Sequence, residues 1–126
     1  MKILFAIAVG GAIGALARFQ LSQLFMRFFS GDFICNILVI NILGCFLMGI
    51  SYEFMNLRLN IDAEWRAFFM VGVLGAFTTF SSFALDIFIL AERGNFLSAG
   101  VYILSSVIFS ILGLLLGVYI MRTTLS

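Results

Sequence analysis

Three uninterrupted runs of uncharged, mostly apolar residues constrain this chain more than any other feature. They contain 20, 19 and 28 residues, at Phe33–Tyr52, Ala67–Leu85 and Gly94–Met121. A fourth apolar segment, from Ile3 to about Met26, is interrupted only by Arg18. A helix that spans a bilayer needs about 20 apolar residues. Since 63% of the residues are hydrophobic and the mean hydropathy is +1.22, a soluble domain this small could not bury them. The runs predict an all-α membrane protein.

We expect one domain, residues 1–126, with four transmembrane helices at about residues 3–26, 33–55, 67–90 and 96–121. An even number of spans places both termini on the same side of the membrane. The apolar stretch after Lys2 imitates a secretory signal, but we expect it to be retained as the first helix.

The third span has an unusual centre, Gly75-Ala76-Phe77-Thr78-Thr79-Phe80-Ser81-Ser82-Phe83. Hydroxyls of Ser and Thr can bond nearby carbonyls and bend a helix, and Gly72 and Gly75 loosen it further. The alternative is an ordinary helix whose hydroxyls bond back to its own carbonyls. Four hydroxyls within residues 78–82 favour a helix broken near residues 76–79. Such a break survives at membrane depth only where it faces protein or a watery cavity.

The charges say little about partners or orientation. The net charge of +1 favours no nucleic-acid partner. Basic residues divide into Lys2, Arg58, Arg66 and Arg122 on one side, and Arg27 and Arg93 on the other, with Arg18 joining the second group if it snorkels. Two alternatives follow. Either the chain inserts both ways, which leads to an antiparallel dimer, or this small bias selects one orientation.

Small residues mark the helix-packing faces. Gly10-xxx-Gly14 and Gly113-xxx-Gly117 match the pattern that lets membrane helices approach closely, and we interpret them as packing surfaces only. Four spans of this size enclose no obvious pore, so we expect a functional unit larger than the monomer.

The sequence does not favour an enzyme. It has no histidine, and its two cysteines, Cys35 and Cys45, lie ten residues apart on one predicted helix. That spacing is roughly 15 Å, which is too long for a disulfide within one chain. No metal cluster or Cys/His nucleophile can be assembled from these residues.

Two polar side chains lie within predicted spans. Arg18 is either a snorkelling anchor or part of an electropositive vestibule that attracts anions. Asn41 is either a helix–helix hydrogen-bonding residue or an amide presented to an ion. Asn36, Glu53 and Asp86 are interpreted as residues near helix ends, at the membrane interface.

Aromatic rings and hydroxyls indicate a polar track through this apolar chain. Phe80 and Phe83 share a helix face, with Ser81 and Ser82 between them, and the positive edge of a phenyl ring can support an anion. In the fourth span, Tyr102, Ser106 and Ser110 form one row of hydroxyls at spacings of four residues.

Three ordered motifs resemble those of the Fluc (CrcB) fluoride channels of bacteria, over essentially the whole chain. Residues 10–19, GGAIGALARF, are similar to the family's GGxxGAxxR motif. Residues 39–44, VINILG, continuing to Phe46 and Gly49, are similar to its VNxxGxFxxG motif. Residues 75–83, GAFTTFSSF, are similar to its GxxTTFSTF signature, the most specific of the three.

The resemblance implies an antiparallel, dual-topology homodimer with two fluoride pores. Phe80 and Phe83 match the aromatic positions of the pore, Asn41 matches the pore asparagine and Arg18 the vestibule arginine. Backbone carbonyls of Gly75 and Thr78 would hold a structural Na⁺ at the dimer centre. The row formed by Tyr102, Ser106 and Ser110 matches the family's hydroxyl track.

This chain departs from the family pattern at three positions. Ile37 stands where the family usually has threonine, which puts one contact of the polar track in doubt. Ser82 replaces a threonine and Asp86 replaces a glutamate, so neither change removes a hydroxyl or a carboxylate.

The favoured function is therefore passive export of fluoride from the cytoplasm through the cell's inner membrane, which would reduce fluoride toxicity. The alternative is a small four-helix proton-coupled multidrug exporter. Such an exporter needs a carboxylate deep in a span, typically the first, and residues 3–26 contain none. A third class, a membrane subunit that transports nothing, would need neither a broken helix nor a polar track.

Overall fold

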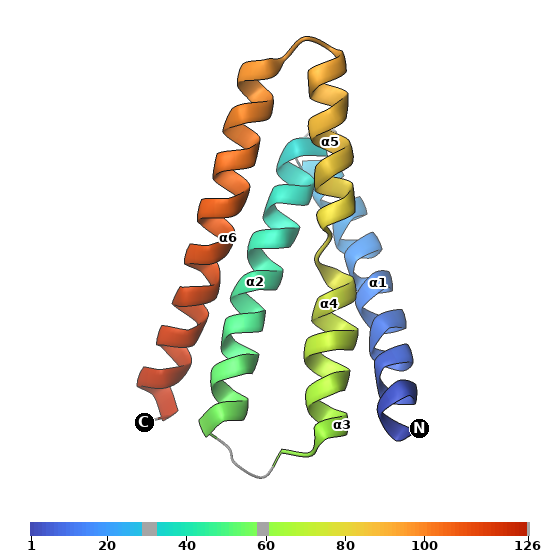
Figure 1. Cartoon of the computed structure of the whole chain (residues 1–126), viewed down its shortest axis with the longest axis vertical. Helices are drawn as coiled ribbons and strands as arrows, with labels where there is room; N and C mark the ends of the chain where they lie inside the picture. Colours follow the sequence, from blue (N-terminus) through green and yellow to red (C-terminus); the bar gives the residue numbers. More distant parts are fainter. Residues whose placement is uncertain (29–32, 58–60, 126) are drawn as a thin grey trace.

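The computed structural model describes residues 1–28, 33–57 and 61–125, nearly all of them helical (Figure 1). Helices α1 (Lys2–Phe28), α2 (Phe33–Leu57) and α6 (Phe96–Leu125) are each a single span. The remaining span consists of four consecutive elements: α3 (Ala63–Arg66), the π-helix η1 (Ala67–Leu74), α4 (Gly75–Phe77) and α5 (Phe80–Glu92). Four helices are long and apolar enough to cross a membrane within this described part. The prediction of an all-α, multi-pass membrane protein is confirmed.

Each helix reaches beyond the span that the sequence predicts. The third span begins at Ala63, four residues before the predicted Ala67, and its first turn contains Glu64 and Arg66. Likewise, α6 continues through Arg122 to Leu125. Charged residues are excluded from the lipid core but not from a helix, so they mark the edge of the membrane and not the end of the helix.

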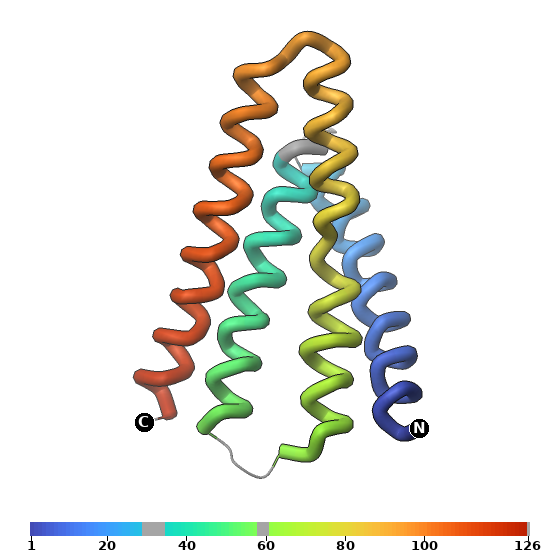
Figure 2. Tube along the Cα trace, in the orientation of Figure 1, coloured from blue at the N-terminus to red at the C-terminus, as the bar shows by residue number. Residues whose placement is uncertain are grey.

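The helices associate in two close pairs. One pair is α1 with η1 and α4, and the other is α2 with α6, while α5 packs against α6 and α2. Figure 2 shows the hairpin of α5 and α6 reaching beyond the adjoining ends of α1 and α2. Both chain termini lie at the opposite end of the molecule, as an even number of spans predicts (Figure 1).

Glycines bring the backbones of each pair together. A Cβ atom on Gly14 would collide with the carbonyl of Val73 on η1, and a Cβ on Gly117 would collide with the carbonyl of Phe46 on α2. Lipid supplies no hydrophobic force between helices, so such close approach is a main source of packing energy. The predicted packing role of both glycine motifs is confirmed.

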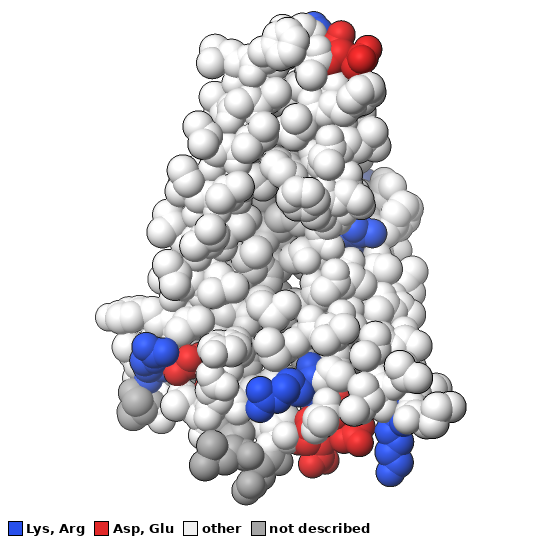
Figure 3. All heavy atoms as spheres, in the orientation of Figure 1, with Lys and Arg blue, Asp and Glu red and all other residues white. Residues whose placement is uncertain are grey.

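Charged side chains on the visible face gather mostly at the two ends of the molecule, with a nearly uncharged band between them (Figure 3). At the end that holds the termini, Arg122 makes two hydrogen bonds to Glu53, at 3.0 and 3.2 Å. Glu53 is buried and ion-paired, so it is more enclosed than an interfacial position predicts. Arg58, counted above with this side, lies outside the described residues.

Candidate functional site

Thr78 and Thr79 interrupt the third span between α4 and α5. Their backbone angles are φ −82°, ψ 158° and φ −150°, ψ 116°, which are values of extended chain. Thr79 then caps α5, because its side-chain oxygen accepts a hydrogen bond from the backbone N–H of Ser82 at 3.1 Å. Two extended residues thus lie within the predicted region 76–79.

Asn41 of α2 binds the backbone of this interruption through two hydrogen bonds. Its Nδ2 donates to the carbonyl oxygen of Thr79 at 3.0 Å, and its Oδ1 accepts from the N–H of Thr79 at 2.8 Å. Both residues are buried. The helix–helix interpretation of Asn41 is therefore observed. Because a carboxamide has two N–H donors, one remains for another acceptor.

A cavity of about 260 Å³ lies between α2, the interruption and α6. Five residues of the predicted ion pathway line it: Asn41, Phe80, Phe83, Ser106 and Ser110. The rest of its described lining is Cys45, Thr78, Thr79, Val107 and Ile111, and none of these ten side chains carries a charge. The fold thus assembles hydroxyls, an amide and two phenyl rings around one small uncharged space.

Three aromatic rings form an edge-to-face series beside this cavity. The centroids of Phe80 and Phe83 are 5.5 Å apart at an interplanar angle of 62°, and those of Phe83 and Tyr102 are 5.1 Å apart at 83°. In such arrangements the positive ring edges face outward or toward a neighbour's negative face. Phe83 is buried, whereas Phe80 is 78% exposed on the surface of the single chain.

The predicted hydroxyl row of α6 divides into two parts. Ser106 and Ser110 line the cavity, whereas the hydroxyl of Tyr102 lies outside it and donates to Oδ2 of Asp86 at 2.9 Å. Asp86 lies six residues before the end of α5 and is buried, so it is more enclosed than the interfacial position predicted for it. The tyrosine hydroxyl gives this buried carboxylate a hydrogen-bond partner.

The other predicted residues do not line the cavity. Ser81 places its hydroxyl 3.3 Å from the hydroxyl of Thr79, and Ser82 contributes the capped N–H. Arg18 is half-buried on α1. Ile37 packs against the cluster that includes Phe83 and Tyr102, so an apolar contact occupies the position of the family threonine.

Sequence reasoning missed two residues of this region. Cys45 lines the cavity together with Ser110, and its position one turn after Asn41 was the available signal. Asn36, interpreted as interfacial, is buried and donates to Ser22 at 2.6 Å, while its Oδ1 has no hydrogen-bond partner among the described residues. No spacing in the sequence predicts the contact with Ser22.

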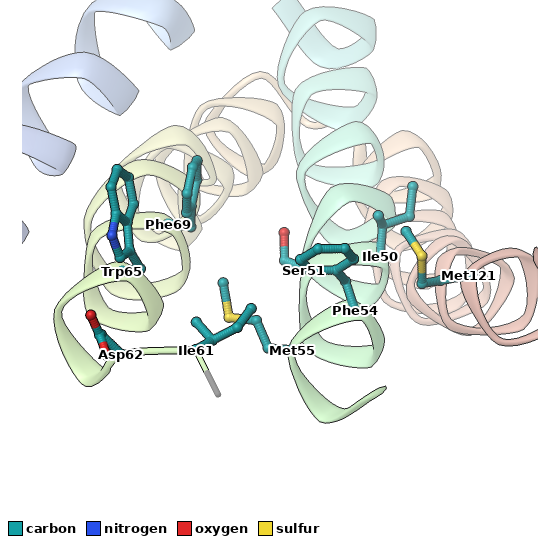
Figure 4. A pocket seen from close by; sticks show the side chains of 9 residues that line it. All are labelled: Ile50, Ser51, Phe54, Met55, Ile61, Asp62, Trp65, Phe69 and Met121. Carbon is teal, nitrogen blue, oxygen red and sulfur yellow. The ribbon is translucent and has the colours of Figure 1, made fainter. Parts of the chain in front are cut away.

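A second, larger cavity of about 550 Å³ lies toward the end that holds the termini, between α2, the start of the third span and α6. Figure 4 shows Trp65 and Phe69 on one wall, facing Phe54 and Ile50 on the other. Its described lining is mostly apolar and includes no residue of the predicted ion pathway. It is therefore a mostly apolar groove, with Asp62 as the charged residue of its described lining.

Comparison with known proteins identifies the family. A family described as CrcB-like protein, Camphor Resistance (CrcB), matches residues 5–118. A protein of Rhizobium etli (strain CIAT 652) named fluoride-specific ion channel FluC is 39% identical over 118 residues, which are 94% of this chain and 94% of that protein. The protein of the same name from Agrobacterium fabrum is 42% identical over 116 residues, 92% of this chain and 93% of its own length. One from Methylococcus capsulatus is 44% identical over 119 residues, 94% of this chain but 52% of that longer protein. The chain therefore belongs to the CrcB family.

Proposed function

We propose that this protein is a fluoride-selective ion channel that lets F⁻ leave the cytoplasm passively across the cell's inner membrane, and so reduces fluoride toxicity. Relatives at 39% to 44% identity carry the name fluoride-specific ion channel. The observation in this chain that supports it most is the uncharged cavity of about 260 Å³ where Asn41, Phe80, Phe83, Ser106 and Ser110 meet.

The cavity has the chemistry that a fluoride pathway requires. Fluoride is small and strongly hydrated, so a pathway must replace its water with donors and still let the ion leave. The remaining N–H of Asn41 and the hydroxyls of Ser106 and Ser110 are neutral donors. Ring edges of Phe80 and Phe83 add a weak positive potential without a full charge. An ion is thus stabilised but not trapped.

The remaining predicted residues extend this pathway. Ser81 and Ser82 adjoin the cavity at the start of α5, and Tyr102 orients the ring of Phe83 through its edge contact. Arg18 supplies the positive potential of a vestibule, which raises the local concentration of anions before they enter.

The functional unit that we propose is an antiparallel, dual-topology homodimer. Phe80 is 78% exposed and Gly75 is exposed, so groups of both proposed sites lie at the surface of a single chain. A second copy would enclose them. The nearly even division of basic residues between the two sides permits insertion in both orientations.

We also propose a structural Na⁺ at the dimer centre, held by the backbone carbonyls of Gly75 and Thr78. The hydrogen bonding of the interruption fits such a site. In a continuous helix the N–H of Thr79 would donate to Gly75 and that of Ser82 to Thr78. Here these N–H groups donate to Asn41 and to the side chain of Thr79. The two carbonyls are neutral oxygen ligands, which suit a monovalent ion, since Ca²⁺ and Mg²⁺ usually recruit carboxylates.

Ion flux from liposomes tests the proposed function. Purified protein in vesicles loaded with fluoride is expected to release F⁻, measured with a fluoride electrode, far faster than Cl⁻ is released from matched vesicles. A proton-coupled exporter would instead require a proton gradient and leave fluoride inside. Absence of any flux from correctly inserted protein would indicate a subunit that transports nothing.

A further inference from the structure

We infer that α2 shapes the interruption of the third span, with Asn41 and Gly44 as its positioning residues, so that Asn41 serves the proposed cation site as well as the proposed fluoride cavity. The two sites that Asn41 would serve are taken from the proposed function. The positioning of the interruption by Asn41 and Gly44 is argued from observed contacts.

The first contact removes a hydrogen-bond donor from Gly75. The N–H of Thr79 is the group that would occupy the Gly75 carbonyl in a continuous helix. It donates to Oδ1 of Asn41 at 2.8 Å instead. Asn41 therefore keeps that carbonyl available by binding the competing N–H, although it lies 38 residues away in sequence from Thr79.

The second contact holds the peptide of Thr79 in an extended conformation. Nδ2 of Asn41 donates to the carbonyl of the same residue at 3.0 Å, so one carboxamide binds both backbone groups of Thr79. A neighbouring β-strand would make the same pair of bonds. Both partners are buried, and an unpaired amide or backbone group at this depth is costly, so the extended state is favoured over a continuous helix.

The third contact seats the other residue of the interruption. Gly44 follows Asn41 by three residues, so both face the same side of α2. A Cβ atom on Gly44 would collide with the side-chain methyl of Thr78 and lie 3.1 Å from the ring of Phe77. The bare Cα of Gly44 is thus the surface against which Thr78 packs.

These contacts make Asn41 the common member of two sites. Its oxygen and one N–H determine where the carbonyls of the interruption lie, while its second N–H is left for the cavity that Asn41 also lines. Losing the whole carboxamide is expected to weaken cation retention and fluoride flux together. Losing the N–H donors while an oxygen remains is expected to weaken fluoride flux much more than cation retention, because the bond from Thr79 N–H is kept and only the bond to its carbonyl is lost.

Thermal unfolding in detergent tests this separation. Purified protein is unfolded in rising NaCl, with N-methyl-D-glucamine chloride keeping the ionic strength constant, and fluoride efflux is measured in parallel. For Asn41→Leu we expect the Na⁺ concentration for half-maximal stabilisation to rise about tenfold, and efflux to be lost. Asn41→Asp keeps an oxygen for the N–H of Thr79, so its Na⁺ response is expected to stay within about threefold of wild type while efflux falls.

Two further variants serve as tests if Asn41→Leu does not assemble. Gly44→Ala leaves the carboxamide intact but displaces Thr78, so its Na⁺ response is expected to weaken by about threefold or more. Ser110→Ala changes the opposite wall of the cavity, and its Na⁺ response is expected to match wild type.

The outcomes distinguish this inference from the proposed function. The positioning role is wrong if Asn41→Leu loses fluoride efflux but keeps the wild-type Na⁺ response. It is also wrong if Gly44→Ala keeps the wild-type Na⁺ response. Neither result contradicts the proposed function as a fluoride channel. Fluoride efflux from a wild-type protein that shows no Na⁺ response overturns the inference in the same way. A wild-type protein that responds to Na⁺ through Asn41 but releases no fluoride supports the positioning and overturns the proposed function.

Discussion

Helix α2 makes two contacts of opposite character. Against α6 it presents glycine and backbone: Gly117 of α6 approaches the carbonyl of Phe46, and Gly49 of α2 approaches the carbonyl of Leu114. Against the interruption it presents an amide, which hydrogen-bonds both backbone groups of Thr79. The first contact brings two intact helices together, and the second stabilises backbone that has left the helix.

The difference shows how the demands on buried residues vary within one membrane protein. A helix satisfies its own backbone, so the close contacts of intact helices need only small residues and dense packing. Extended backbone within the membrane must form its hydrogen bonds with other parts of the protein. The contact between α2 and the interruption therefore needs polar side chains at defined positions. Substitutions at the first kind of contact are expected to affect assembly, and those at the second to affect ion chemistry.

The largest effect is expected where intact helices meet most closely. Gly14→Leu would place a side chain on the backbone of Val73, forcing α1 away from η1, and we expect no monodisperse protein by size-exclusion chromatography. Gly11→Leu is the matched control on the same helix, because nothing lies within 4 Å of a Cβ there. If both variants behave alike, the close contact at Gly14 does not govern assembly.

A large effect on flux, with little on assembly, is expected at the cavity. Phe83→Ile keeps an apolar side chain but removes the ring edge, and we expect fluoride efflux to fall by about tenfold or more. Phe80→Ile is expected to act in the same direction. Phe88→Ile is the control, since Phe88 is exposed on α5 outside the cavity lining. Wild-type efflux from either cavity variant would remove the role proposed for that ring.

A moderate loss of stability is expected at the cap of α5. Thr79→Val keeps the shape of the side chain but removes the oxygen that accepts from Ser82, which costs about 1 kcal/mol of unfolding free energy. Thr79→Ser keeps that oxygen and is expected to lose less. Chemical unfolding in detergent measures the difference, and equal stabilities would mean that the cap contributes nothing.

The smallest effect is expected for Thr78→Ser, because the proposed cation ligand is a backbone oxygen and serine keeps the hydroxyl that bonds Leu74. We expect a change within about 0.5 kcal/mol in stability and near-wild-type efflux. The same substitution removes the methyl that a Cβ on Gly44 would strike. The double variant Gly44→Ala/Thr78→Ser is therefore expected to recover part of the Na⁺ response that Gly44→Ala loses. If the double variant does not recover any Na⁺ response, the collision with the Thr78 methyl is not the reason that position 44 requires glycine.

The spans could be predicted because lipid imposes a local rule. Any run of about 20 apolar residues satisfies it, whatever lies beside the run. The ends of the helices could not be predicted from the same rule, since Glu64 and Arg66 are compatible with a helix that emerges from the membrane. The burial of Asp86 also could not be predicted from the sequence, because it depends on the hydroxyl of Tyr102, which belongs to a different helix.

The candidate site shows the same division residue by residue. Helical spacing is local, so sequence alone determined that Phe80 and Phe83 share one helix face and that Ser106 and Ser110 share another. Sequence also identified the residues where the third span could leave the helix, since threonines beside glycine weaken it there. Only the tertiary structure decided that Asn41 pairs with Thr79, that Tyr102 turns to Asp86, and that Cys45 joins the cavity. These contacts depend on which helices are neighbours and on how each helix is rotated about its own axis. Both are determined by the packing of whole helix surfaces, which no short stretch of residues encodes.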